Sequence, residues 1–180
     1  MQPVTLEDIN DAAKLLDGVI KKTPSISAGW IEKKYGVDVT FKCENLQRAG
    51  SFKIRGAYNR IARLTSEQRN KGVVAASAGN HAQGVALAAQ ILGIKATIFM
   101  PIGATLPKYQ ATLGYGADVI FHGKTIDEAL MAASAFSDET GAVFIHPFDH
   151  EHIVAGQGTM GLEVLAQNPD VKTVVVCTGG

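Results

Sequence analysis

The sequence predicts an α/β protein whose open, twisted parallel sheet has helices on both faces. Four apolar runs, at residues 73–76, 96–100, 118–121 and 142–145, alternate with segments of helical periodicity. Runs that are apolar throughout suit parallel strands, because helices cover such strands on both faces. The 19 glycines also fit the many tight turns between strands and helices that this fold class needs.

The N-terminal segment is predicted to be mainly helical. Thr5 and Asp8 form a capping signal before apolar residues at helical spacing, and a second short helix around Trp30 ends at Gly36. From residue 37 to residue 43 apolar and polar side chains alternate. This alternation predicts a half-buried strand.

Lys53 is predicted to lie in the first turn of a helix. It precedes apolar residues that recur at helical spacing, and Ser51 is the expected cap. The positive end of the helix dipole, the nearby Arg55 and the apolar Phe52 would all disfavour an ammonium group there. A lysine with a lowered pKa is a good nucleophile, although on these features alone a solvated pair of basic residues is the more common outcome.

The rest of the chain is predicted to alternate strands and helices. A strand at 73–76 leads through a turn at 77–80 into a helix at 81–92, which Gly93 terminates. The later elements follow in chain order: strand 96–100, helix 106–113 with Pro107 in its first turn, strand 118–121, a helix opened by a capping box at 125–128, strand 142–145, a helix around 160–165 and strand 172–177.

Composition and charge argue against several function classes. Lys plus Arg and Asp plus Glu number 17 each, so the formal net charge is zero and gives no support to nucleic-acid or anionic-membrane binding. No run of about 18 apolar residues occurs, and Cys43 and Cys177 stand far apart without C-x-x-C spacing. We expect a cytoplasmic protein with reduced thiols and with neither a nucleic-acid nor a membrane partner.

The segment from Ser77 to His81 is a candidate anion site, because it lies where a strand meets the start of a helix. Backbone amides and the helix dipole there favour a carboxylate or phosphate, and Ser77 and Asn80 add directional donors. A plain turn with a helix cap is an equally good interpretation. Gly179 and Gly180, after the last predicted strand, could begin a phosphate-binding loop, whereas neither a P-loop nor a G-x-G-x-x-G pattern after a strand is present.

A cluster of histidine and acidic residues between His146 and His152 invites a metal interpretation, since imidazole and carboxylate groups suit transition metals. Pro147 follows the strand directly, and no second ligand group stands out elsewhere in the sequence. We therefore predict no metal site and expect a solvated loop that enters a helix near Glu151.

Five motifs together resemble the pyridoxal-phosphate enzymes of the tryptophan-synthase β-subunit fold type, and within that group the chain is most similar to the threonine dehydratases. In chain order they are Lys42-Cys-Glu-Asn-Leu-Gln47, Ala49-Gly-Ser-Phe-Lys-Ile-Arg-Gly56, Ser77-Ala-Gly-Asn-His-Ala-Gln-Gly84, Phe148-Asp-His150 and Ala155-Gly-Gln-Gly-Thr159. Their joint occurrence is specific for the fold type. The distinction from serine racemases and serine dehydratases rests largely on the third and fifth motifs.

The resemblance implies a role for each matching residue. Lys53 would hold pyridoxal 5'-phosphate as a Schiff base and later move the substrate Cα proton. Phe52 would pack beside the pyridine ring, and Asn80 would hydrogen-bond the ring hydroxyl oxygen. The substrate carboxylate would be held by Ser77 and by backbone amides of the same turn, from Ala78, Gly79, Asn80 and His81. Gly179 and Gly180 would open the loop that binds the cofactor phosphate.

The resemblance also implies an activity and a domain organisation. The expected reaction is the dehydrating deamination of L-threonine, with L-serine as a second candidate, to 2-oxobutanoate (pyruvate) and ammonia, in threonine catabolism or isoleucine biosynthesis. Residues 1–53 would begin a large domain, 54–152 would form a small α/β domain, and 153–180 would return to the large domain of a dimeric or tetrameric homo-oligomer. Two alternatives stay open: a serine racemase, and a non-catalytic module or inactive fragment that binds anions or nucleotides.

Overall fold

A four-stranded parallel sheet forms the centre of the fold, as the sequence predicts. The computed structural model describes residues 3–177, and its sheet has the strand order β5-β4-β3-β6 with every neighbouring pair parallel. β6 is shorter than the predicted run 142–145, because it pairs with β3 over two residues only. The strands are β3 (Val73–Ala76), β4 (Ala96–Met100), β5 (Asp118–Phe121) and β6 (Val143–Phe144).

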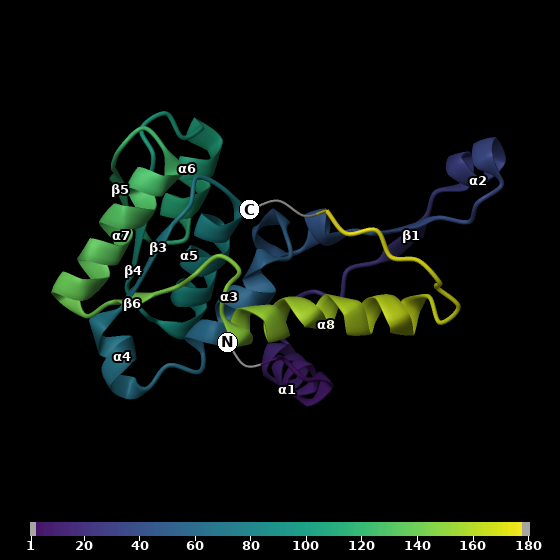
Figure 1. Cartoon of the computed structure of the whole chain (residues 1–180), viewed down its shortest axis with the longest axis horizontal. Helices are drawn as coiled ribbons and strands as arrows, with labels where there is room; N and C mark the ends of the chain where they lie inside the picture. The colour runs from purple at the N-terminus through teal and green to yellow at the C-terminus, as the bar shows by residue number, and fades with distance from the viewer. Residues whose placement is uncertain (1–2, 178–180) are drawn as a thin grey trace.

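Alternate side chains of β3 enter two different apolar clusters. Val73 and Ala75 pack with residues of α3 (Lys53–Ile61) and α5 (Asn80–Leu92). Val74 and Ala76 pack with alanines of α7 (Ile126–Thr140). Figure 1 shows α7 on one side of the sheet and α5 on the other. The sheet is thus covered on both faces, as a parallel sheet requires.

Capping boxes open three of the helices. The two boxes that were predicted, at Thr5 and Thr125, are both present. A third, made by Thr65 and Gln68, opens α4 (Ser66–Lys71), a short helix that the sequence analysis did not predict. Each box supplies acceptors for amides that the first turn of a helix leaves unpaired. α6 (Leu106–Gly114) instead begins with the predicted proline in its first turn.

Helix α3 lies between two other helices, and Figure 1 shows it between the sheet and the long helix α8. It packs against α5 on one side and against α8 (Glu151–Gln167) on the other, while α1 (Leu6–Leu16) covers α8. Ile54 and Ile61 of α3 are fully buried in the larger apolar cluster. No helix among residues 3–177 is long and apolar enough to cross a membrane.

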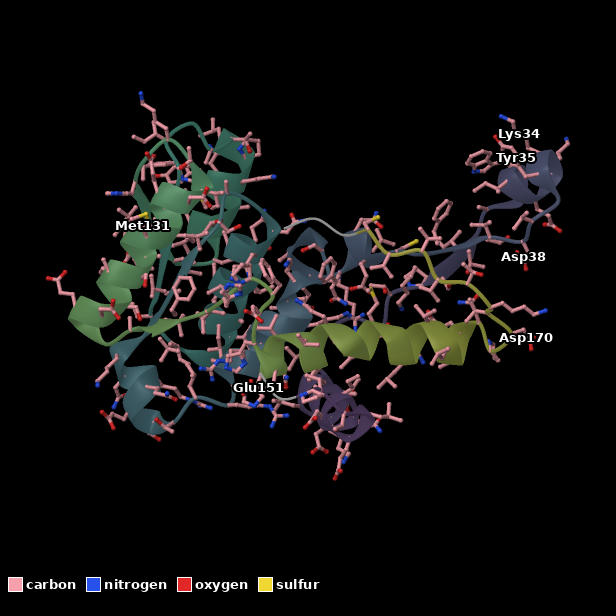
Figure 2. The ribbon with its side chains drawn as sticks, in the orientation of Figure 1. Lys34, Tyr35, Asp38, Met131, Glu151 and Asp170 are labelled. Atoms are coloured by element: carbon pink, nitrogen blue, oxygen red, sulfur yellow. The ribbon has the colours of Figure 1, made fainter. Side chains whose placement is uncertain are left out.

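An antiparallel ribbon projects away from the sheet (Figure 1). It pairs β1 (Ser25–Ser27) with β2 (Thr40–Lys42), and α2 (Gly29–Tyr35) lies at its tip, where Figure 2 labels Lys34, Tyr35 and Asp38. The prediction of a half-buried strand over residues 37–43 is therefore wrong in length and in burial, since Phe41 is 50% exposed. The ribbon contacts the end of α8 through polar groups, for example Asn168 with Ser25 and Thr40, while its apolar side chains stay half exposed.

The predicted strand at residues 172–177 is also wrong. Within the described part of the chain this segment pairs with no strand, and Val175 is 91% exposed. An apolar run becomes a strand only where a neighbouring strand supplies partners for its backbone amides and carbonyls. The local pattern alone cannot reveal whether that neighbour is there.

Candidate active site

Lys53 is the first residue of α3, as predicted, but the capping differs from the prediction. The chain reaches it from β2 through two short 3₁₀ turns, Glu44–Leu46 and Arg48–Gly50. Phe52 rather than Ser51 occupies the cap position, and its side chain makes no capping hydrogen bond. The Ser51 hydroxyl still accepts from the Lys53 amide, over a long distance of 3.4 Å.

The Lys53 ammonium is half-buried and has two close neighbours. Its Nζ donates to the carbonyl oxygen of Pro147 at 2.8 Å, and it lies 5.4 Å from the centre of the Phe52 ring. Burial lowers the pKa of Lys53 below the ordinary lysine value of 10.5. A larger fraction of the side chain is therefore the neutral amine near neutral pH, which is the form that attacks a carbonyl group.

The turn from Ser77 to Asn80 follows β3 at the carboxyl end of the sheet. The Gly79 amide donates to the Ser77 hydroxyl at 3.1 Å, and Gly79 caps α5 without any side-chain hydrogen bond. Asn80, the first residue of α5, is exposed. Lys108 of α6 lies beside this turn, since a Cβ added to Gly79 would be 3.4 Å from its Nζ. Helix amides and an ammonium group therefore meet here, which suits an anion.

His81 differs from the other residues predicted to bind substrate, because its side chain is buried. The ring is 4% exposed, and its Nε2 lies 2.9 Å from the carbonyl oxygen of Ile145, so the neutral ring donates from Nε2. Burial, and to a lesser extent the nearby charge of Lys53, lower the pKa of His81 to about 4. Only the backbone amide of His81 is left to face a ligand in the turn.

Three glycines allow neighbouring helices to approach α3 closely. A Cβ added to Gly84 of α5 would lie 3.1 Å from the carbonyl carbon of Lys53. On the other side, a Cβ on Gly156 of α8 would lie 2.6 Å from the Arg55 carbonyl oxygen, and one on Gly56 would lie 2.8 Å from the Ile153 carbonyl oxygen. The contact at Gly84 holds the start of α5, and with it the Ser77–Asn80 turn, against the lysine.

A buried ionic network fixes α3 to α8 and to the segment that precedes it. Arg55 has no exposed side-chain surface and binds Glu44 through two hydrogen bonds, of 2.8 and 2.9 Å. Its third nitrogen donates to Glu163 at 2.7 Å, and Glu163 also pairs with Lys42. Two cations and two anions thus neutralise one another, and Thr159 is a further acceptor for Arg55. Paired and hydrogen-bonded charges of this kind hold their helices in one arrangement.

The loop between β6 and α8 holds the carbonyl group that binds Lys53. His146 Nδ1 accepts from the amides of Phe148 and Asp149, at 3.3 and 2.7 Å, and so closes a turn around Pro147. The sequence predicts that this loop enters a helix near Glu151, and α8 does begin there (Figure 2). No local pattern links the loop with Lys53, which is 94 residues earlier in the chain.

His150, Glu151 and His152 place three potential metal-ligand atoms within 4.8 Å of one another. Two observations argue against a cation there. His150 Nδ1 already accepts from the His152 amide at 3.1 Å, so the proton of the neutral ring is on Nε2. Burial, together with nearby arginines, Arg60 at His150 and Arg63 with Arg60 at His152, lowers the pKa values of both histidines, and the positive charges of these arginines would also repel a cation. The cluster is a poor candidate for a metal.

The structure brings together most of the residues that the sequence singled out. Lys53 and Phe52 lie at the start of α3, and Ser77, Ala78, Gly79 and Asn80 form the turn held against it through Gly84. Gly179 and Gly180 lie outside the described residues. Pro147, Lys108 and the partners of Arg55 were missed, because no local sequence signal marks a contact between distant segments.

Comparisons with known proteins agree with this arrangement. The family model described as "Pyridoxal-phosphate dependent enzyme" matches residues 16–180. The chain is 54% identical to an L-threonine ammonia-lyase of Thermotoga maritima over 98% of its own length and 44% of that protein's. It is 48% identical to an L-threonine ammonia-lyase of Geobacter sulfurreducens over 100% of its own length and 44% of that protein's. The chain thus spans about half the length of the curated relatives that it matches.

Two solved structures show the same fold. Maize serine racemase superposes with a TM-score of 0.89 at 40% identity, over 93% of this chain and 51% of that one. Threonine deaminase isoform 2 of Solanum lycopersicum superposes with a TM-score of 0.87 at 41% identity, over 92% and 46%.

Proposed function

The chain belongs to the pyridoxal-phosphate dependent enzyme family, and on that premise we propose that it takes part in the dehydrating deamination of L-threonine, with L-serine as a second substrate. The products are 2-oxobutanoate, or pyruvate from serine, and ammonia. Support comes from relatives named L-threonine ammonia-lyase, which are 48–54% identical over nearly the whole chain.

The residues present fit the aldehyde end of the cofactor. Such a group needs a nucleophilic amine, an apolar surface for its ring and a hydrogen-bond donor. The half-buried Lys53 amine with its lowered pKa, the Phe52 ring beside it and the exposed side-chain amide of Asn80 supply these three. We propose that Lys53 holds the cofactor covalently, that Phe52 packs beside its ring and that Asn80 hydrogen-bonds its ring oxygen. For the phosphate end we propose Gly179 and Gly180.

Pyridoxal phosphate, when bound, supplies a reactive aldehyde and a ring that spreads the negative charge left on a substrate carbon. Lys53 has two tasks in the proposed reaction. Its neutral ε-amine is the nucleophile that bonds to the cofactor, and once substrate frees that amine it accepts the proton from the substrate Cα. The lowered pKa serves both tasks, since each requires Nζ without its extra proton.

We propose that the Ser77–His81 turn binds the substrate carboxylate. Amides at the start of α5 donate to it, the Ser77 hydroxyl adds a further donor, and Lys108 adds a positive charge beside Gly79. A carboxylate fixed at this end of α5 places the adjacent Cα near Lys53, because Gly84 holds the second turn of α5 against the lysine backbone. The close packing of Gly84, one turn after the anion site, against the Lys53 backbone is the observation on which the proposal depends.

A second candidate function is serine racemisation, favoured by the likeness to maize serine racemase. Both reactions begin with removal of the Cα proton, and they differ in whether the β-hydroxyl leaves or the proton returns on the opposite face. Identity favours the deamination, at 54% for the Thermotoga maritima relative against 40% for the racemase structure. Incubation with L-serine separates the two, since one yields pyruvate and ammonia and the other D-serine.

The domain organisation and setting are part of the same proposal. Residues 54–152 would form a small domain that contains the parallel sheet, and residues 1–53 and 153–180 would belong to a larger one. We further propose a cytoplasmic homo-oligomer. Size-exclusion chromatography with light scattering measures its assembly state directly.

Spectroscopy with a lysine variant tests the proposal. The purified protein, mixed with pyridoxal phosphate, should gain an absorbance band that threonine alters, and borohydride should fix the cofactor to Lys53 as identified by peptide mass. Lys53→Ala should abolish both signals, while Lys95→Ala, at a lysine with a 75% exposed side chain, should keep them. If a carboxylate binds equally well to wild type and Lys53→Ala and no cofactor is ever fixed, the chain is instead a non-catalytic binding module.

A further inference from the structure

The first turn of α3, which carries Lys53, is completed by a side chain from another helix. In a regular α-helix that begins here, the Gly56 amide would donate to the Phe52 carbonyl. In this protein the Phe52 carbonyl accepts the Arg55 amide at 3.0 Å, one residue early. The Gly56 amide donates at 3.1 Å to Oε1 of Gln157, which lies on α8. The first turn of α3 is therefore closed by one hydrogen bond of the i→i+3 type and by a side chain of α8.

The close approach of the two helices makes this contact feasible. A Cβ on Gly56 would lie 2.7 Å from Gln157 Nε2, and a Cβ on Gly156 would lie 2.6 Å from the Gly56 Cα. Any side chain at either position would push α8 away from α3. About one and two turns beyond Gly156 on α8, Thr159 and Glu163 bind the buried guanidinium of Arg55. Four residues of α8 thus contact the turn that begins with Lys53, and Figure 1 shows α8 beside α3.

We propose that Gln157 is a positioning residue for Lys53. The inference rests on the proposed function, because it concerns how the reactive amine is aimed. The pitch of a helical turn sets the direction in which its first side chain leaves the backbone. With the turn in its present shape, Lys53 Nζ lies within hydrogen-bond reach of Pro147, at 2.8 Å. A glutamine suits this role, because it offers an acceptor oxygen without a negative charge beside the lysine.

Two variants of Gln157 separate the hydrogen bond from simple packing. Gln157→Leu keeps the approximate volume and loses the acceptor, whereas Gln157→Glu keeps an acceptor oxygen at the same reach. Gln167→Leu is the matched control, since Gln167 is also a half-buried glutamine of α8 but bonds to Lys42 and Thr23. If Gln157 positions the lysine, the first variant should be impaired, the second rescued and the control unaffected in lysine chemistry.

The first measurement is the rate at which Lys53 captures pyridoxal phosphate. The ε-amine adds to the aldehyde carbon and one water leaves; borohydride then reduces the new carbon–nitrogen double bond, and peptide mass identifies Lys53. Rates are compared at the high-pH plateau, where the lysine is neutral in every variant. Gln157→Leu should be slower by about ten- to a hundredfold, since a misplacement of about 1 Å can cost a hundredfold. Gln157→Glu and Gln167→Leu should capture at close to the wild-type rate.

The second measurement needs no cofactor. Amide hydrogen exchange of Gly56 should speed up in Gln157→Leu but not in Gln157→Glu or Gln167→Leu, because only the first variant removes its acceptor. Unchanged exchange and an unchanged plateau rate in a folded Gln157→Leu would overturn the inference. So would an equal loss of rate in Gln167→Leu, which would show general destabilisation. If the wild type captures no cofactor, the proposed function is refuted. Hydrogen exchange of the Gly56 amide still tests whether Gln157 closes the first turn of α3.

Discussion

Protonation of His81 should destabilise the fold as the pH falls. The ring is buried between α5 and the end of the sheet, where its neutral form donates to the Ile145 carbonyl. A second proton on the ring would place a charge in this buried site, next to the positive charge of Lys53. Burial accordingly lowers the pKa of His81 from 6.5 to about 4.

The sign and size of the effect follow from that difference. Between pH 6.5 and about 4 the unfolded chain binds a proton at His81 that the folded protein does not, so the free energy of unfolding falls as the pH falls through this window. Each unit of pKa difference corresponds to about 1.4 kcal/mol. A difference of about 2.5 units therefore gives a loss of about 3 kcal/mol by pH 4, a large share of the stability of a typical domain.

Urea unfolding at several pH values between 7.5 and 4 measures this loss. His81→Gln is the reference, because its side-chain amide can donate to the same carbonyl and does not titrate. Carboxylates that titrate in this range affect both proteins equally, so the difference between the two curves isolates the histidine. Wild type should lose about 3 kcal/mol more than the variant. Parallel curves would refute the argument that the ring stays neutral because it is buried.

Two further predictions concern contacts of α3, and a third concerns Lys108 beside the Ser77–His81 turn. Gly156→Ala should lower the free energy of unfolding in the urea titration by about 1–3 kcal/mol, because the new methyl group overlaps the Arg55 carbonyl. Gly161→Ala on the same helix is the control. A methyl group there has nothing within 4 Å, so this variant should be neutral or stabilising by up to about 1 kcal/mol. Arg55→Met should cost about 3–5 kcal/mol, since it leaves the buried carboxylate of Glu44 without its cation while Glu163 keeps Lys42, and a smaller loss would mean that water reaches Glu44. Lys108→Met should raise KM for threonine by about two- to fivefold with kcat nearly unchanged, because it removes about 0.5–1 kcal/mol of attraction between an exposed charge and the substrate carboxylate. Steady-state kinetics at low salt measure this change. An unchanged KM would show that Lys108 does not contribute to the carboxylate site.

Elements that carry a strong local signal could be predicted from the sequence. β3, β4 and β5 have the bounds that their apolar runs predict, although only β3 and β4 are buried throughout and β5 is a largely exposed edge strand. α5 and α7 were predicted from a terminating glycine and a capping box respectively, which are local signals. The sequence signals that predict these elements lie within about ten residues of each element.

Elements that depend on a distant partner could not be predicted. β1 is a strand only because β2 pairs with it, and its three residues contain a single large apolar side chain. The run at residues 172–177 shows the opposite error, since it has the composition of a strand and no partner among the described residues. Strand formation is a property of two segments, so a pattern in one of them is insufficient evidence.

The candidate site divides in the same way. Lys53 and the Ser77–Asn80 turn lie at helix starts, and helix starts leave a local signature. The groups that govern their chemistry come from elsewhere in the chain: the Pro147 carbonyl, the buried partners of Arg55 and the Gln157 side chain. The sequence could therefore identify the reactive lysine but not what holds it in place.

The glycines of three motifs show why family patterns carry more information than their local physics reveals. Gly56, Gly84 and Gly156 lie in helices, where glycine costs about 1 kcal/mol relative to alanine and no positive φ requires it. From the sequence alone they look like local defects in good helices. In the fold each one lies where the backbone of α3 meets a neighbouring helix, and a Cβ would collide there or nearly so. Glycine at these positions lowers helix propensity but allows α3 to pack closely between α5 and α8. This packing fixes the position of Lys53 at the start of α3.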